Sequence, residues 1–257
     1  MNVSVDPQIF FTYKAKDIQT KLSDNPTCIE VTDTAAQARL KLNKFDFDQA
    51  PVTSDGVVIG WLRTADLSDD AKINQIFKNL SQRDLISAEA PLNEALFRLT
   101  SQELIFLVGS NGIEGFIVRS DISRHVSRAH LYLLISGLEI VMARIVARDL
   151  NDHDILMSLM KNSSKEAWEK DKRLGYDANP IEYLDLRGLG DAIARIKDAM
   201  NHMAISIADW KKFVLTLTDI RNWVAHSNTE QITKHPFFDI VDKMRLTEKC
   251  IKSLLKY

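Results

Sequence analysis

Two stretches of the chain align with each other and decide its fold. They are Ala50-Pro-Val-Thr-Ser-Asp-Gly-Val-Val-Ile-Gly-Trp-Leu-Arg-Thr-Ala-Asp-Leu67 and Ile105-Phe-Leu-Val-Gly-Ser-Asn-Gly-Ile-Glu-Gly-Phe-Ile-Val-Arg-Ser-Asp-Ile122. In this alignment Gly60 falls on Gly115, and Asp66 falls on Asp121. Upstream, residues 28–38 match residues 85–95 in the same way. An internal repeat of this length indicates that each copy buries one face against the other.

Each copy predicts a short strand, a helix, two strands joined by an Asp-Gly or Asn-Gly turn, and then a second helix. The copies extend over about residues 13–69 and 81–126. Residues 1–126 therefore form one predicted domain of mixed strands and helices.

The two copies resemble a tandem pair of CBS domains, also called a Bateman module. The resemblance rests on the Ala50-Pro51-Val52 strand and on the Gly-φ-φ-x-x-x-Asp segments that end at Asp66 and Asp121. It covers nearly the first half of the chain. It implies a cleft that binds an adenine nucleotide (AMP, ADP or ATP) as a regulatory ligand. In such a cleft the Asp holds the ribose hydroxyls, and a Ser or Thr three residues earlier helps to bind phosphate.

The chain departs from this family pattern at the Ser/Thr position, where it has Arg63 in the first copy and Val118 in the second. A guanidinium can contact phosphate as a charged fork, whereas a valine side chain has no donor. The resemblance therefore implies Asp66, Arg63 and Asp121 as nucleotide-binding residues, with at most one strong site per chain. The alternative is that both aspartates only stabilise the first turn of a helix, and that the pair is a structural or dimerising module.

The second half of the chain has only helical patterns. One long helix is expected from Asp121 to about Leu150, another over residues 154–174, and another that is interrupted near Gly188 and Gly190. Five or so helices in about 130 residues predict a bundle. The fold class is therefore α+β with two domains: a CBS-like pair over residues 1–126 and an all-α domain over residues 127–257.

Residues 131–146 are apolar on more than one face of their helix, which predicts cover by a partner subunit and hence a homodimer. Asp substitutions at Leu134 and Leu138 are expected to split this dimer. Glu139 is the conspicuous charge in this segment. It either faces the site that contains Arg221, or it faces solvent or pairs with Arg144.

Near the C-terminus, Asp219-Ile-Arg-Asn-Trp-Val-Ala-His-Ser227 closes a run of buried-helix periodicity. Asn222 and His226 share a helical face, and the long side chain of Arg221 can reach the same point. A protonated imidazole at a helix C-terminus is favoured by the partial negative charge there.

This segment resembles the Arg-x4–6-His motif of HEPN domains, many of which are metal-independent ribonucleases. The resemblance implies that RNA is cleaved by its own 2′-hydroxyl and that two subunits bring their motifs together. His226 would act as general acid or base, Arg221 would stabilise the charged transition state, and Asn222 would orient the phosphate or the ring. The alternative is an Arg and a His at the end of a core helix, since Arg148 and His153 have the same spacing.

Composition excludes some function classes. The formal net charge of −2 carries no global nucleic-acid signal, so RNA would require a local basic patch. Cys28 and Cys250 form no cysteine framework, which fits a reducing cytosol. The first residues have no secretory pattern, and no run approaches the roughly 18 apolar residues of a membrane span. No paired cysteines or His-Glu-x-x-His motif indicate a metal site. A cytoplasmic location without a membrane is expected.

Two functions from different classes remain open. The first is a nucleotide-regulated, metal-independent endoribonuclease of the toxin or defence type. The second is a non-catalytic adenine-nucleotide sensor or dimerisation scaffold that regulates a partner protein. The sequence leaves open whether the protein is an enzyme.

Overall fold

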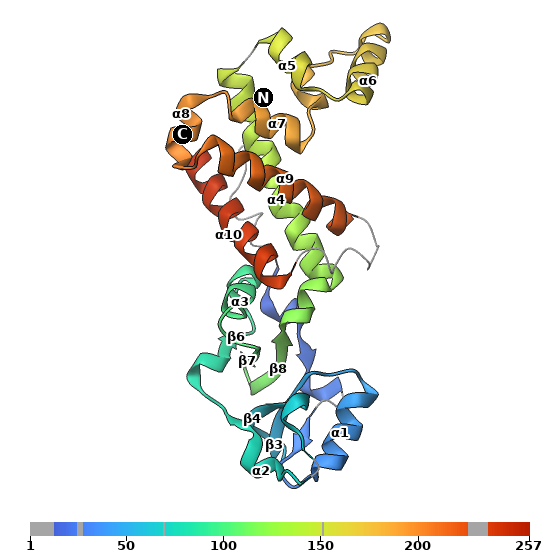
Figure 1. Ribbon diagram of the computed structural model, residues 1–257, viewed down its shortest axis with the longest axis vertical. Helices are drawn as coiled ribbons and strands as arrows, with labels where there is room; N and C mark the ends of the chain where they lie inside the picture. Colours follow the sequence, from blue (N-terminus) through green and yellow to red (C-terminus); the bar gives the residue numbers. More distant parts are fainter. Residues whose placement is uncertain (1–12, 25–27, 69, 151, 226–235) are drawn as a thin grey trace. The chain divides into compact units, whose positions relative to one another are not determined.

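The computed structural model describes residues 13–24, 28–68, 70–150, 152–225 and 236–257, and the chain divides into two compact units, Met1–Ser127 and Arg128–Tyr257 (Figure 1). The first unit contains all the described strands, and the second is helical. The prediction of an α+β fold with CBS-like sheets followed by a helical region is confirmed.

Within its described residues, the first unit contains two four-stranded sheets, ordered β2-β3-β4-β5 and β1-β8-β7-β6. Each sheet combines a parallel pair, β2/β3 or β6/β7, with an antiparallel hairpin, β3/β4 or β7/β8. The strands are β1 (Thr20–Lys21), β2 (Ile29–Glu30), β3 (Gln49–Ser54), β4 (Val57–Arg63), β5 (Lys78–Asn79), β6 (Leu85–Ser87), β7 (Leu104–Gly109) and β8 (Gly112–Val118). The helices are η2 (Ala15–Ile18), η3 (Leu22–Asp24), α1 (Ala35–Lys44), η4 (Thr64–Asp66), α2 (Ile73–Ile76), η5 (Gln82–Asp84), α3 (Leu92–Arg98) and η6 (Arg119–Ser123).

A short strand at or just before the start of each copy joins the sheet of the other copy. Strand β1 lies near the start of the first copy but pairs with β8 of the second, and β5 lies just before the second copy but pairs with β4 of the first. The aligned glycines make room for these strands. A Cβ on Gly60 would lie 2.1 Å from the carbonyl oxygen of Lys78, and one on Gly115 would lie 2.7 Å from that of Thr20. Glycine is therefore needed at both aligned positions, because the backbone of β5 approaches Gly60 closely and the backbone of β1 approaches Gly115 closely.

Two apolar clusters hold the first unit together. In the first copy, α1 packs on its sheet through residues such as Ala38 and Leu42. A second cluster joins the copies, because Val58 and Trp61 of β4 pack with Leu104, Phe106 and Phe116 of the second sheet. The repeat predicts that each copy buries one face against the other, and this second cluster is such a buried face.

The second helix of each copy differs from the prediction, because η4 and η6 are short 3₁₀ helices. The long helix does not begin at Asp121 either. Arg124 has an extended backbone with ψ of 149°, and α4 (His125–Asp149) begins after it. The physical reason is local: the Asp121 carboxylate accepts from the Val118 N–H, and the Ser127 hydroxyl donates to the Asp121 carbonyl. These bonds close a tight turn in place of an α-helical start.

The second unit is built from α4 and from α5 (His153–Leu159), α6 (Asn162–Arg173), η7 (Pro180–Tyr183), α7 (Leu186–Ile193), α8 (Lys197–Met203), α9 (Ile207–Ala225) and α10 (Phe237–Leu254). The helix predicted over residues 154–174 breaks at Met160 and Lys161, which are both extended. The expected interruption at the glycines is also absent, since α7 runs through Gly190. That glycine permits close packing, because an added Cβ would lie 2.7 Å from Val214 Cγ1, and its carbonyl accepts from the Trp210 indole at 2.8 Å.

Helix α4 is apolar on several faces, as predicted, but more than half of its apolar window is buried in the chain itself. Leu134 and Leu138 are buried, so Asp at these positions would disrupt the core of the subunit itself and would not test a dimer selectively. The exposed apolar side chains of α4 are Tyr132 and Ile140, at 40% and 47% exposure. The expectation that no run approaches a membrane span was wrong for this helix, because among the described residues α4 alone has the length and apolar composition of one; 56% of that window is buried, as in a core helix.

Candidate functional sites

Arg63 ends β4 at the face where the two copies meet. Its Nε donates to Glu103 Oε2 at 2.6 Å, and its Nη2 contacts Glu103 Oε1. Glu103 belongs to the second copy and directly precedes β7. The neighbouring carboxylates of Glu103 and Asp66 raise the pKa of Arg63, and Glu103 has the larger effect. Asp66 follows Arg63 by three residues, in η4, and Glu103 is a partner of Arg63 that the sequence did not indicate.

Asp66 and Asp121 occupy the same repeat position in different environments. Asp66 ends η4 and is exposed. Asp121 is only 5% exposed, and its two carboxylate oxygens accept from the Val118 N–H at 2.8 Å and from Arg124 Nε at 2.6 Å. Burial raises the pKa of Asp121, and the two hydrogen-bond donors oppose this shift. Asp121 therefore has an evident structural role, whereas Asp66 is open to a ligand.

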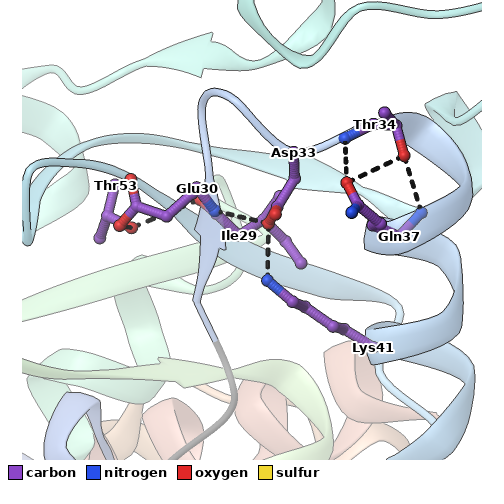
Figure 2. Close-up of polar contacts among 7 residues, drawn as sticks. All are labelled: Ile29, Glu30, Asp33, Thr34, Gln37, Lys41 and Thr53. Atoms are coloured by element: carbon purple, nitrogen blue, oxygen red, sulfur yellow. Dashed lines mark hydrogen bonds and ion pairs between the residues drawn. The ribbon is translucent and has the colours of Figure 1, made fainter.

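The first copy also contains a cavity of about 530 Å³, lined by residues 31–35 and 70–74. Its charged side chains are Asp33, Asp70 and Lys72. Figure 2 shows the Asp33 carboxylate between the Glu30 N–H, at 2.9 Å, and the Lys41 ammonium, at 2.6 Å. None of the three predicted nucleotide-binding residues lines this cavity. It is nevertheless of the size that small-molecule sites have.

One end of the cavity is shaped by the start of α1. Thr34 Oγ1 accepts from the Gln37 N–H at 3.2 Å, and Gln37 Oε1 accepts from the Thr34 N–H at 2.9 Å, as Figure 2 shows. This capping box fixes the loop that carries Asp33. The motif was visible in the sequence as Thr-x-x-Gln, but no cavity could be inferred from it.

In the second unit, Arg221 of α9 lies beside Glu139 of α4, with Nε 3.6 Å from Oε1. The sequence left three orientations possible for Glu139: toward Arg221, toward solvent, or paired with Arg144. In the structure Glu139 lies beside Arg221. The Glu139 side chain is 18% exposed. Burial raises its pKa, while the charge of Arg221 opposes the shift. The pair is therefore a partly buried acid and cation within reach of one another.

The other two predicted catalytic residues are differently placed. Asn222 is exposed on α9, and His226 lies outside the described residues. Sequence reasoning missed Arg128 of α4, whose Nη2 donates to the carbonyls of Trp223 and Val224 at 3.0 and 3.2 Å. Both carbonyls lie in the last turn of α9, which ends at Ala225, so Arg128 supplies positive charge at this helix terminus.

The described residues contain no group of three or more His, Cys, Asp or Glu side chains that could hold a metal ion. Cys250 is buried, and burial raises its pKa to about 12, which disfavours the reactive thiolate.

Several solved CBS-domain structures are similar to part of this chain. A hemolysin-like protein with a CBS domain from Oenococcus oeni has a TM-score of 0.39 and 18% identity, over 44% of this chain and 89% of that one. A CBS-pair protein from Arabidopsis thaliana has a TM-score of 0.40 and 14% identity, over 46% and 96% of the two chains. The CBS domains of a Streptococcus pneumoniae transcriptional regulator have a TM-score of 0.38 and 18% identity, over 43% and 97%.

Neither a family model nor a curated protein matches the sequence. The similar structures named above align with the N-terminal part of the chain. The CBS-like description of the first unit rests on its own repeat, its paired strand orders and its exchanged strands.

Proposed function

We propose that the first unit is a regulatory CBS pair that binds an adenine nucleotide through Arg63 and Asp66. One observation carries this proposal: Arg63 ends β4 beside Glu103 of the second copy, and the exposed Asp66 follows three residues later in η4, so a guanidinium and an open carboxylate flank the same strand end. The carboxylate can accept hydrogen bonds from ribose hydroxyls, and the guanidinium can bind phosphate with two parallel donors. AMP, ADP and ATP all carry both groups.

Only one strong site per chain is proposed. The corresponding position in the second copy pairs Val118, which has no side-chain donor, with the buried Asp121. The Asp121 carboxylate already has two protein donors, so a ribose would have to displace them. Asp121 therefore remains the weakest of the three nucleotide-binding assignments.

Titration calorimetry with AMP, ADP and ATP tests this proposal. Asp66→Ala and Arg63→Gln are each expected to weaken binding at least about tenfold, because each removes a contact that involves a charged group. Lys72→Gln is the matched control, since it removes a cation from the separate cavity. If Lys72→Gln abolishes binding and Asp66→Ala does not, the nucleotide binds in the cavity. Absence of binding by any of the three nucleotides at millimolar concentration would reject a sensor function.

A metal-independent ribonuclease in the helical unit is the second proposal, and the proximity of Glu139 to Arg221 favours it over a purely scaffolding role. A partly buried carboxylate beside Arg221 would hold the guanidinium in place for an anionic transition state. His226 would move protons and Asn222 would orient the phosphate or the imidazole. A homodimer would bring two such motifs together.

The chain provides its own control for this proposal. Arg148 and His153 have the same spacing as Arg221 and His226, but Arg148 pairs with Asp149 and His153 contacts the ring of Trp168. Incubation with total RNA in chelator should give products with 2′,3′-cyclic phosphate ends. Arg221→Ala and His226→Ala should each reduce cleavage about 10²–10⁴-fold. Arg148→Ala and His153→Ala should not. Equal losses in all four variants, or no cleavage by the unaltered protein, would leave the non-catalytic sensor or scaffold.

A homodimer is also proposed, with contacts through the exposed Tyr132 and Ile140 of α4. Asp substitutions at these two positions should yield monomers in sedimentation without unfolding the protein. If the unaltered protein sediments as a monomer at micromolar concentration, the homodimer is rejected. The proposed location remains the cytoplasm, where Cys28 and Cys250 stay reduced.

A further inference from the structure

Glu103 contacts two cations from the β2-β3-β4-β5 sheet. Both of its carboxylate oxygens contact the Arg63 guanidinium, and its Oε1 lies 3.9 Å from Lys78 Nζ. Lys78 Nζ in turn lies 4.1 Å from the centre of the Trp61 ring. One carboxylate thus sits between two positive groups that belong to adjacent strands, β4 and β5.

This two-oxygen contact has the geometry in which arginine binds phosphate. A guanidinium presents parallel N–H donors that fit two oxygens of a carboxylate or of a phosphate equally well. A phosphate group and Glu103 would therefore compete for the same donors on Arg63.

The pair is also accessible to a competitor. The side chains of Arg63, Glu103 and Lys78 are 37%, 26% and 43% exposed, so solvent screens their interactions. Ion pairs at such positions are worth little, and a terminal phosphate carries more negative charge than one carboxylate. A nucleotide bound through Asp66 would add its phosphate at high local concentration.

We propose that Glu103 occupies the phosphate position on Arg63 in the ligand-free protein, and that nucleotide binding exchanges this carboxylate for phosphate. The inference rests on the proposed nucleotide site. Glu103 would then lower the affinity for every phosphorylated ligand, and its release would break an ion pair that joins the two copies. Lys78 would be left beside the incoming phosphate as a second cation.

The repeat contains a natural contrast for this exchange. Glu103 aligns with Asp48, and Arg63 aligns with Val118. By the alignment, the equivalent ion pair from the second copy to the first would join Val118 to Asp48. A valine has no charge, so this ion pair cannot form. The ion pair is therefore confined to the side of the repeat where Arg63 replaces the usual Ser or Thr.

The test compares Glu103→Gln with Asp48→Asn, which removes the equivalent exposed carboxylate. Glutamine keeps the shape of Glu103 but loses the charge that competes with phosphate. Calorimetry should show AMP binding about fivefold tighter in Glu103→Gln, the factor that one exposed ion pair allows, while adenosine binding and the Asp48→Asn variant stay unchanged. In an Arg63→Gln background, Glu103→Gln should have no effect on AMP binding. Glu103→Asp, whose shorter side chain cannot maintain both contacts, serves if Glu103→Gln does not fold.

The outcomes separate this inference from the site on which it rests. If AMP binds the unaltered protein and Asp66→Ala abolishes binding, but Glu103→Gln binds AMP with equal or lower affinity, Glu103 is only a structural link. An equal gain for AMP and adenosine would also overturn the exchange, because adenosine has no phosphate. If neither the unaltered protein nor Glu103→Gln binds any nucleotide, the proposed site itself falls.

Discussion

Asp66 and Asp121 occupy the same position in two aligned copies, and the structure gives them different surroundings. Asp66 is exposed beside Arg63, whereas Asp121 is buried and accepts hydrogen bonds from its own turn and from Arg124. Three residues earlier, the first copy has an arginine and the second a valine. The two copies therefore share backbone geometry more closely than they share the exposure and hydrogen-bond partners of aligned side chains. The same aspartate can serve a ligand in one copy and the fold in the other.

The largest expected effect is a loss of stability at a feature that both copies share: a glycine that lies against a strand paired across the repeat, β5 for Gly60 and β1 for Gly115. Gly60→Ala should cost roughly 3 kcal/mol of stability and Gly115→Ala roughly half of that, within the range for overpacked interiors. The reason is the nearest backbone atom to an added Cβ, at 2.1 Å for Gly60 and 2.7 Å for Gly115. Urea denaturation measures both values. If Gly115→Ala costs more stability than Gly60→Ala, the backbone of β1 lies closer to Gly115 than the backbone of β5 lies to Gly60, which contradicts these distances.

The next prediction addresses the difference between the two aspartates. Asp121→Ala should destabilise the protein by roughly 2 kcal/mol, because the partly buried Val118 N–H loses its acceptor and Arg124 loses its partner. Asp66→Ala should change stability by less than about 0.5 kcal/mol, as exposed substitutions usually do. Thermal denaturation of the two variants provides the measurement. A stability loss for Asp66→Ala as large as that for Asp121→Ala would contradict a division between ligand binding and folding.

Much of this comparison could be predicted from the sequence, because it depends on local patterns. The repeat and the hairpins follow from short-range spacing, whereas Arg63, Asp66 and Asp121 were named from the resemblance to CBS domains. The missing parts depend on long-range contacts. Strands β1 and β5 have two residues each, too few for a pattern of alternation, and Glu103 lies 40 positions from Arg63.

The helical unit shows the same limit. The helix that carries Arg221 was predicted from its periodicity, but its neighbours Glu139 and Arg128 are distant in sequence. The start of α4 was predicted wrongly because apolar periodicity does not report the hydrogen bonds of Asp121, which shorten the preceding turn. Periodicity shows which face of a helix is buried, but it does not identify the partner across the interface.

The smallest expected effect is the pH dependence of Asp121. Burial raises the pKa of this carboxyl in the folded protein above its unfolded value of 3.8. The stability that comes from this shift is fully present below the unfolded pKa and is lost as pH rises through the folded pKa. Asp121→Asn keeps an acceptor for the Val118 N–H and cannot ionise. The unaltered protein should therefore lose stability relative to Asp121→Asn as the pH rises from about 3 to 7.

A second buried group makes this variant comparison necessary. Burial lowers the pKa of His130, in α4, from 6.5 to about 4, so its contribution has the opposite sign and destabilises the fold as pH falls below 6.5. His130 is present in both proteins, and subtracting the two stability curves removes its contribution. The difference curve should then report Asp121 alone, measured by urea denaturation at several pH values. A flat difference would mean that the hydrogen bonds from Val118 and Arg124 fully offset the burial of Asp121, and the two aspartates would then differ in exposure but not in the energetics of their charge.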